Sequence, residues 1–377
     1  MFSRRQVMAM AATAPIIAHM SGAAVAMTEI EAAGVEAGRP ESLRHAAELA
    51  GRFFGAAARI DQIESDPALK ALMLKDCAAV TPEIHLKWDS LQYNEGAYNF
   101  APADGLVAFA VRHGLEVRGH TLLWDQSTPR WAKRKLTREK DWDLIARYFR
   151  DVLGRYAGQV GTWDVINEPI DSQGGQDGLR TNTFFRAFGP SYIARALHEA
   201  RRHAPQARLV LNEYGFDYDN SVEEDRRRLF LRLIEQLRRD GAPLDGVGVQ
   251  AHLDLSKGPF KPSILRGFLK ELAGFDLEIV ITELDVKEDN KRASLAERDR
   301  RVADEAASYL AVALEEPAVR GVVTWGLSDR HSWLQDQSRG LPSPSEAPRL
   351  NRGLPYDAAL TRKDMYWALR DTFVERA

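Results

Sequence analysis

The chain has 377 residues, of which 45% are hydrophobic, and a formal net charge of −3 at pH 7. This near balance excludes the basic stripe of a nucleic-acid-binding protein and the polybasic patch of a membrane-bound one. The single cysteine, Cys77, excludes an intrachain disulfide and a Cys-x-x-Cys metal site. Its apolar neighbours predict a buried structural thiol.

The first 26 residues are predicted to be an export signal, not part of the fold. Arg4 and Arg5 precede an Ala/Met/Ile-rich run and resemble a twin-arginine signal, and residues 24–26 offer a small-residue cleavage site. An amphipathic first helix and a membrane anchor are the alternatives. A proline and a histidine interrupt the run, which is short for a span. We therefore expect an exported protein, periplasmic or secreted, without stable membrane insertion.

After a polar segment at 27–41, apolar runs typical of buried strands alternate with amphipathic runs typical of helices. The eight strand-like runs are 52–59, 77–83, 115–124, 162–169, 207–214, 246–253, 277–285 and 321–327. Helical patterns between them include 104–114, 143–157, 191–205 and 226–241. Such alternation predicts an α/β fold, a single-domain (β/α)8 TIM barrel over residues 42–377. The Pro/Ser-rich stretch 341–355 is interpreted as a loop of this barrel, not a linker.

Polar or aromatic residues come at the carboxyl ends of the predicted strands, which share one face of a barrel. They are Glu83, His120, Trp124, Asn167, Glu168, Asn212, Glu213, Tyr214, Gln250, His252, Glu283, Asp285 and Trp325. Any one of them alone is more often structural. Since buried carboxylates without a function cost desolvation free energy or a raised pKa, so many polar strand ends favour an active site.

Two of these carboxylates form a natural pair. Glu168 ends the fourth predicted strand and Glu283 the seventh, on opposite sides of a narrow barrel mouth. Facing carboxylates suit the hydrolysis of an acetal, in which one donates a proton and the other is ionised. His252 and Asp285 are expected to hold Glu283 in its ionised form.

Other residues suit sugar binding. Asn167 is placed to hydrogen-bond a sugar hydroxyl, and Trp124, Trp325 and Trp333 offer flat faces for pyranose rings. The sequence carries no Gly-rich phosphate loop, no HExxH motif and no Ser-His-Asp signature. We therefore expect no cofactor and no metal.

The motifs VTPE, LKWD, RGHTLLW, WDVINEP, DGLR, LVLNEY, GVGVQAHL, ITELDV, WGLSDRHSWL and LPYD run from about residue 52 to the final helix. Together they resemble the endo-β-1,4-xylanases of glycoside hydrolase family 10. The resemblance implies a retaining mechanism acting on xylan, with Glu168 as acid/base and Glu283 as nucleophile.

The resemblance also implies which side chains hold the sugar chain or support the nucleophile. The predicted substrate-binding residues, with Tyr214 added from its strand end, are Glu83, Lys87, His120, Trp124, Asn167, Tyr214, Gln250, Trp325 and Trp333, and those supporting the nucleophile are His252 and Asp285. The expected partner is xylan or a related β-glycan chain, and no oligomeric partner is indicated. Two alternatives stay open: a glycanase acting on another β-1,4-linked or mixed-linkage glycan, and a sugar-binding barrel that does not cleave.

Three positions depart from the family pattern. Ile84 stands where the family usually has an Asn that contacts a sugar, and Asp125 and Ser127 replace a His and a Gln. A sugar hydroxyl that loses its partner costs about 1–3 kcal/mol, so the second glycone subsite is predicted to bind xylose weakly. Asp125 and Ser127 are expected to change the polarity or width of the first glycone subsite.

We predict that Ile84→Asn raises kcat/KM on xylo-oligosaccharides, by about ten- to a hundredfold on those long enough to fill this subsite. The measurement compares the variant with the unchanged chain on oligosaccharides of increasing length. Unaltered kcat/KM at every length would contradict the weak-subsite interpretation.

Overall fold

The computed structural model describes residues 40–288, 290–335 and 350–377, and residues 41–377 form one compact unit. The predicted export signal, nearly all of the 27–41 segment and most of the predicted loop 341–355 lie outside the described residues. Within the described ranges, no helix combines the length and the apolar character that crossing a bilayer requires.

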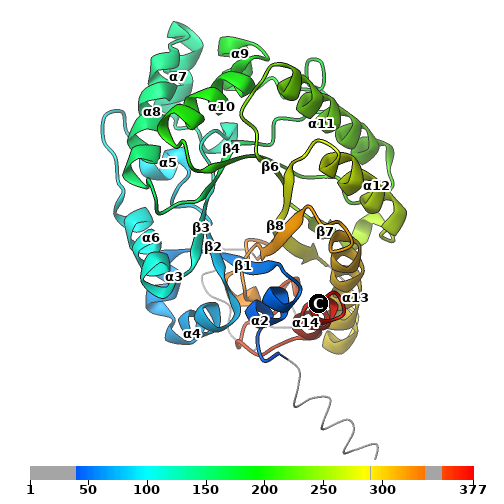
Figure 1. The fold of residues 1–377 in the computed structure, drawn as a ribbon. Coiled ribbons are helices and arrows are strands. Elements are labelled where there is room, and N and C mark those ends of the chain that lie inside the picture. Colours follow the sequence, from blue (N-terminus) through cyan, green and yellow to red (C-terminus); the bar gives the residue numbers. More distant parts are fainter. Residues whose placement is uncertain (1–39, 289, 336–349) are drawn as a thin grey trace, which may run out of the picture. The chain divides into compact units, whose positions relative to one another are not determined.

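A closed ring of parallel strands forms the centre of the molecule (Figure 1). The strands are β1 (Phe53–Ala58), β2 (Ala79–Pro82), β3 (Glu116–Gly119), β4 (Thr162–Asn167), β5 (Arg208–Glu213), β6 (Gly246–Val249), β7 (His252–Asp254), β8 (Glu278–Lys287) and β9 (Val319–Thr324). Neighbours pair in chain order from β1 to β6, and the ring closes through the pairs β6–β8, β8–β9 and β9–β1. The predicted (β/α)8 barrel is therefore confirmed, with β7 as a short addition that pairs with β8.

Helices surround the ring. They are α2 (Leu43–Leu49), α3 (Ile60–Ser65), α4 (Pro67–Asp76), α5 (Trp88–Leu91), α6 (Ala101–His113), α7 (Arg130–Glu139), α8 (Trp142–Arg155), α9 (Thr183–Phe188), α10 (Tyr192–His203), α11 (Ser221–Arg239), α12 (Pro262–Ala273), α13 (Leu295–Ala313) and α14 (Asp364–Val374). Short 3-10 turns are η1 (Asp125–Ser127), η2 (Leu255–Lys257) and η3 (Asp329–His331).

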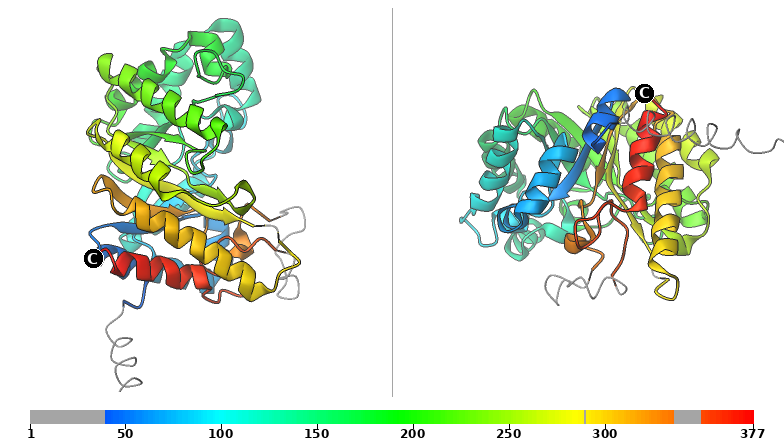
Figure 2. Two further views of the ribbon diagram at one scale, coloured as in Figure 1. Left: turned by 90° about the vertical axis from the view of Figure 1, so that its right-hand side faces the viewer. Right: turned by 90° about the horizontal axis from the view of Figure 1, so that it is seen from below.

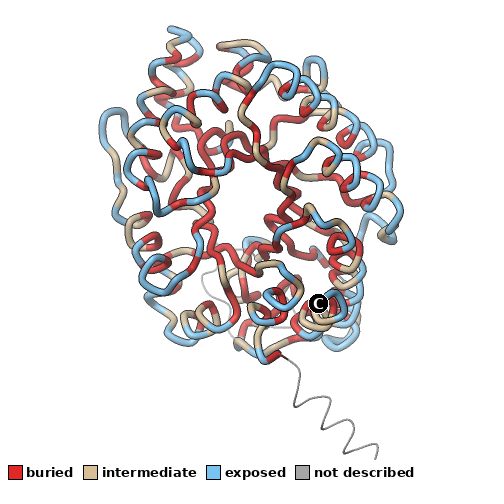
Figure 3. Tube along the Cα trace, viewed as in Figure 1, coloured by how far each residue is buried: buried red, intermediate tan, exposed pale blue. Residues whose placement is uncertain are grey.

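The helices bury one face against the strands and expose the other (Figure 3). In α8 the buried residues include Leu144, Ile145, Tyr148, Phe149 and Val152, a spacing that places them on one side of the helix. The strands are buried over most of their length, as expected when helices cover a parallel sheet. Cys77 lies in this core, where burial raises the pKa of its thiol, in agreement with the predicted structural role.

Three boundaries differ from the sequence prediction. The run 246–253 is two strands, β6 and β7, because the backbone turns at Ala251, whose φ is 60°. The run 115–124 is a strand only to Gly119, so His120 and Trp124 lie in the following loop. Helix α11 begins several residues earlier than its apolar pattern, since the Asn220 side chain caps it by accepting from Glu223 N–H.

A buried carboxylate joins the first and last elements of the described unit. Asp76, at the end of α4, accepts hydrogen bonds from Leu43 N–H at 3.0 Å, Tyr366 O–H at 2.9 Å and Tyr356 O–H at 2.5 Å. Leu43 begins α2 and Tyr366 belongs to α14, which lies beside α13 (Figure 2). Asp76 therefore ties α14 to α2, the first helix of the described residues.

We predict that Asp76→Ala destabilises the fold by about 3 kcal/mol or more, because three buried donors lose their acceptor. Thermal unfolding followed by circular dichroism measures this loss. Asp225→Ala, which removes an exposed helical ion pair with Arg228, is the matched control and should cost less than about 0.5 kcal/mol. Equal unfolding temperatures for the two variants would contradict the proposed tie.

Candidate active site

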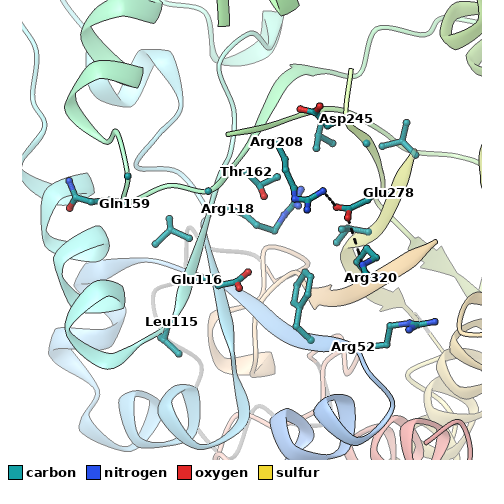
Figure 4. Close-up of a pocket in the computed structure, with 18 of the residues that line it drawn as sticks. Arg52, Leu115, Glu116, Arg118, Gln159, Thr162, Arg208, Asp245, Glu278 and Arg320 are labelled. Atoms are coloured by element: carbon teal, nitrogen blue, oxygen red, sulfur yellow. Dashed lines mark ion pairs between the residues drawn. The ribbon is translucent and has the colours of Figure 1, made fainter. Parts of the chain in front are cut away.

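The two mouths of the barrel hold different kinds of cavity. The amino-terminal mouth has a cavity of about 640 Å³, in which Glu278 pairs with Arg208 and Arg320 (Figure 4). None of the predicted site residues lies there. The carboxyl-terminal mouth has a cleft of about 460 Å³ lined by all of them: Glu83, Lys87, His120, Trp124, Asn167, Glu168, Tyr214, Gln250, His252, Glu283, Asp285, Trp325 and Trp333. The chemistry, not the size, identifies the second cavity as the candidate site.

The two carboxylates enter this cleft from different depths. Glu283 lies within β8, four residues before Lys287 ends the strand, and is only 4% exposed. Glu168 follows the last residue of β4 and is half-buried. One carboxylate is thus held inside the barrel wall and the other stands at its rim.

Side-chain donors surround the Glu283 carboxylate. Asn212 Nδ2 donates to Oε1 at 2.7 Å, and His252 Nε2 lies 3.2 Å from Oε2. Burial by itself raises the pKa of Glu283, but the His252 hydrogen bond, the positive charges of His120 and His252 and the Asn212 amide outweigh it and lower the pKa to about 2. Glu283 is therefore ionised from weakly acidic pH upward.

A second carboxylate keeps His252 charged. The two strands β7 and β8 place His252 opposite Asp285, and His252 Nδ1 lies 2.9 Å from Asp285 Oδ1. Burial lowers the pKa of His252, whereas the charge and hydrogen bonds of Asp285 and Glu283 raise it well above its usual range. Trp333 Nε1–H donates to the other Asp285 oxygen at 2.6 Å, which fixes the carboxylate from outside.

An amide network connects the two sides of the cleft. Asn167 Oδ1 accepts from Asn212 Nδ2 at 2.9 Å and from Gln250 Nε2 at 3.3 Å. With its oxygen so engaged, the Asn167 amide nitrogen points toward Glu168, whose Oε1 lies 3.4 Å away. Thr282 Oγ1 donates to Asn212 Oδ1 at 2.7 Å and orients the central amide. Asn167 is therefore left with N–H donors at the surface of the cleft.

Aromatic and cationic side chains form another wall. Lys87 Nζ lies 4.8 Å from the ring centroid of Trp124 and 5.8 Å from that of Trp325. Burial lowers the pKa of Lys87, although Glu283 and Glu83 oppose this effect. Apolar ring faces beside a few charged groups suit a ligand with apolar ring faces and hydroxyl edges, such as a sugar chain.

Beneath this wall lies a buried chain of charged groups. His120 packs edge-on against Trp325, with ring centroids 5.2 Å apart. His120 Nδ1 lies 3.0 Å from Asp164 Oδ2, and Arg118 donates to the other Asp164 oxygen at 2.9 Å. The three groups are nearly inaccessible, so the orientation of His120 is fixed from within the barrel.

Several cleft residues escaped the sequence prediction. They are Gln126, Leu253, Asp254, Lys257, Lys287 and Leu334. Asn212 was noticed as a strand-end residue but not as the donor to Glu283. Its position in β5, one residue before Glu213 ends the strand, was the available signal. Within the described ranges, no group of three or more His, Cys, Asp or Glu side chains is arranged to hold a metal ion.

The three departures from the family pattern are not among the residues that line this cleft. The Asp125 carboxylate accepts from Thr183 N–H at 3.0 Å and from Lys133 at 3.2 Å, and Ser127 is buried. Their polar groups hold η1 in place, and Gln126 between them lines the cleft instead. The expected change in the polarity or width of the first glycone subsite stays a prediction. Ile84 lines another cavity, of about 560 Å³, with His85.

We predict that His252→Asn raises the pKa of Glu283 by about one unit or more, because the variant loses a positive charge and a hydrogen bond to the carboxylate. Carbon-13 NMR titration of labelled glutamate carboxyl groups measures this directly. The matched control is His203→Asn, which breaks a histidine–carboxylate pair with Glu199 on α10, away from the cleft. An unchanged Glu283 titration in the His252 variant would contradict the assigned cause.

Three comparisons place the chain among known proteins. The sequence profile of glycosyl hydrolase family 10 matches residues 42–372. Endo-1,4-beta-xylanase B of Thermotoga neapolitana is 29% identical over 301 residues, which are 79% of this chain and 81% of that protein. Endo-1,4-beta-xylanase 3 of Hypocrea jecorina is 32% identical over 264 residues, 70% of each chain.

A solved structure agrees with the sequence relatives. Xylanase 10B from Thermotoga petrophila in complex with xylobiose superposes with a TM-score of 0.78 at 26% identity, covering 89% of this chain and 98% of that one. The barrel, the paired carboxylates in its carboxyl-terminal mouth and the match over most of the chain lead to one assignment. The chain belongs to glycosyl hydrolase family 10.

Proposed function

We propose that this protein is an endo-β-1,4-xylanase that cleaves xylan by a retaining double displacement. The observation that carries the proposal is the carboxylate pair, in which Glu283 is buried and ionised while Glu168 stands half-buried at the rim of the same cleft. The sequence relatives are endo-1,4-beta-xylanases, and the related solved structure holds xylobiose.

In the first step, a Glu283 oxygen bonds to the anomeric carbon as the bond from that carbon to the leaving sugar oxygen breaks. Glu168 gives its proton to the departing oxygen, and a glycosyl ester on Glu283 remains. In the second step, Glu168 takes a proton from water as the water oxygen replaces Glu283 at the anomeric carbon. The two inversions together retain the β configuration.

The low pKa of Glu283 suits the nucleophile. A carboxylate with a pKa of about 2 stays ionised from weakly acidic pH upward, as a nucleophile requires. The Asn212 and His252 donors that lower this pKa also stabilise the carboxylate when it leaves in the second step.

The remaining cleft residues are proposed to bind the sugar chain. Asn167 offers N–H donors next to Glu168, and Gln250 supports it. Trp124 and Trp325 both lie near Lys87, where the ring faces can contact pyranose rings and the ammonium can reach hydroxyls. Glu83, His120, Tyr214 and Trp333 complete the lining.

Export rests on the first residues of the chain. Arg4 and Arg5 before an apolar run and the small residues at 24–26 support a cleaved signal over residues 1–26. A substrate as large as a plant polysaccharide must be met outside the cell, so we propose a periplasmic or secreted enzyme composed of one catalytic domain over residues 42–377.

We predict that Glu283→Ala abolishes turnover of xylan and of aryl xylobiosides alike. Glu168→Ala is expected to lower kcat/KM on phenyl xylobioside by about 10²–10⁴-fold and to spare kcat/KM on dinitrophenyl xylobioside, whose leaving group needs no acid. Steady-state kinetics and proton NMR of the first-formed anomer are the measurements.

Four outcomes would overturn parts of this proposal. A first-formed α-anomer would exclude retention, and an active Glu283→Ala variant would exclude Glu283 as nucleophile. Release of products from mixed-linkage glucan or cellulose in preference to xylan would favour the other glycanase activity, and binding of xylan without any release would favour a sugar-binding barrel.

A further inference from the structure

The backbone at Glu168 has an unusual conformation. Its φ is 57°, in the left-handed region that residues with a side chain rarely adopt. Such a conformation is strained and persists only when the surroundings hold it. Because φ also sets the direction of the Cα–Cβ bond, whatever holds this backbone aims the carboxyl group.

An arginine holds the carbonyl side of this residue. Arg180 Nε donates to the Glu168 carbonyl at 3.0 Å, and Arg180 Nη2 donates to the Ile170 carbonyl at 3.1 Å and the Tyr214 hydroxyl at 3.3 Å. On the other side, Glu168 N–H donates to the Asn212 carbonyl at 2.9 Å. Both backbone polar groups of Glu168 are therefore bonded.

A loop whose two ends pair with each other brings Arg180 back to Glu168. Ile170 and Leu179 form an antiparallel bridge, and Arg180 N–H donates to the Pro169 carbonyl at 2.7 Å. The residues between the bridge partners thus leave and rejoin the barrel at the end of β4. This geometry explains how a residue twelve positions along the chain reaches the Glu168 backbone.

A buried ion pair stabilises the backbone just after Glu168. Glu213 is inaccessible, pairs with Arg226, and accepts from Ile170 N–H at 2.7 Å and Tyr214 N–H at 3.0 Å. Arg226 also donates to the Ile170 carbonyl at 3.2 Å. Removal of either partner would leave a buried charge and threaten the fold. Arg180 is half-buried, so it can be changed with less damage.

The carboxyl group itself is held more loosely than its backbone. Among the described residues, its side-chain hydrogen bond is the 3.4 Å contact from Asn167. A group that must give up and regain a proton benefits from such freedom, provided that its backbone is fixed.

We propose that Arg180 is a positioning residue for acid/base catalysis. Its guanidinium holds the left-handed backbone at Glu168 and so aims the carboxyl group at the glycosidic oxygen. The inference rests on the proposed function, in which Glu168 is the acid/base. A guanidinium suits this role because Nε and Nη2 reach two carbonyls at once, whereas a lysine ammonium is a single flexible point charge.

The test compares leaving groups in Arg180→Met and Arg180→Lys. We expect kcat/KM on phenyl xylobioside to fall by about 10²-fold, since a misaimed acid no longer reaches the departing oxygen. On dinitrophenyl xylobioside kcat/KM should change by less than about threefold, because that bond breaks without an acid. The Lys variant is expected to recover only part of the loss.

The readout is the ratio of two kcat/KM values from one preparation, so partial unfolding cancels. Arg186→Met is the matched control: Arg186 is exposed and donates to the Thr181 carbonyl, and its removal should leave both values unchanged. Equal losses on both glycosides would show a general structural role for Arg180, and no loss on either would show no role. Both results overturn the proposal.

Failure of the proposed function gives a different result. If the unchanged chain cleaves neither xylobioside, the xylanase assignment fails before any variant is compared. If the unchanged chain is active and Glu168→Ala shows the leaving-group dependence while the Arg180 variants do not, only the positioning role fails.

Discussion

The carboxyl-terminal mouth of the barrel is organised around one buried negative charge. Glu283 is only 4% exposed, and a carboxylate in such a place costs several kcal/mol of desolvation unless donors compensate it. Asn212 and His252 supply those donors, and Asp285 keeps His252 charged. Because these three supporting residues lie on different strands, keeping one carboxylate ionised constrains side chains on several strands.

The two carboxylates are controlled by different means. Glu283 is held through its side chain, by donors that bond the carboxylate oxygens and keep it ionised. Glu168 is held through its backbone, by Asn212 and Arg180, while its carboxyl group stays freer. A nucleophile that must be ionised when it attacks needs fixed donors, and a group that exchanges protons needs a fixed direction without them. The two carboxylates thus have different environments, and each environment suits the role proposed for it.

Sequence patterns predict the barrel and many, though not all, of the residues that meet in its cleft. Strand ends share one face by topology, so Asn167, Gln250 and Trp325 are predictable from the sequence. The pattern was insufficient where backbone geometry intervenes. The positive φ of Ala251 splits the sixth run and creates β7, whose pairing puts His252 opposite Asp285. The spacing of hydrophobic residues in the sequence does not indicate such a turn.

Arg180 was overlooked for a related reason. Arg180 belongs to the DGLR motif, but it bonds to backbone carbonyls, and no pattern of neighbouring residues indicates such a contact. Asp125 is a second example, because it stands beside Trp124 and yet its carboxylate accepts from Thr183 N–H and does not line the cleft. Side chains that bond the backbone are invisible to patterns of side-chain type.

The two mouths of the barrel are connected through its interior. Arg118 borders the amino-terminal cavity and bonds Asp164, which bonds His120 at the carboxyl-terminal cleft. One Asp164 oxygen contacts Arg118 and the other contacts His120, so a single carboxylate serves a structural cation and a histidine of the cleft. The contact between Arg118 and Asp164 therefore also restricts the orientation of His120 at the carboxyl-terminal cleft, because one buried carboxylate contacts both side chains.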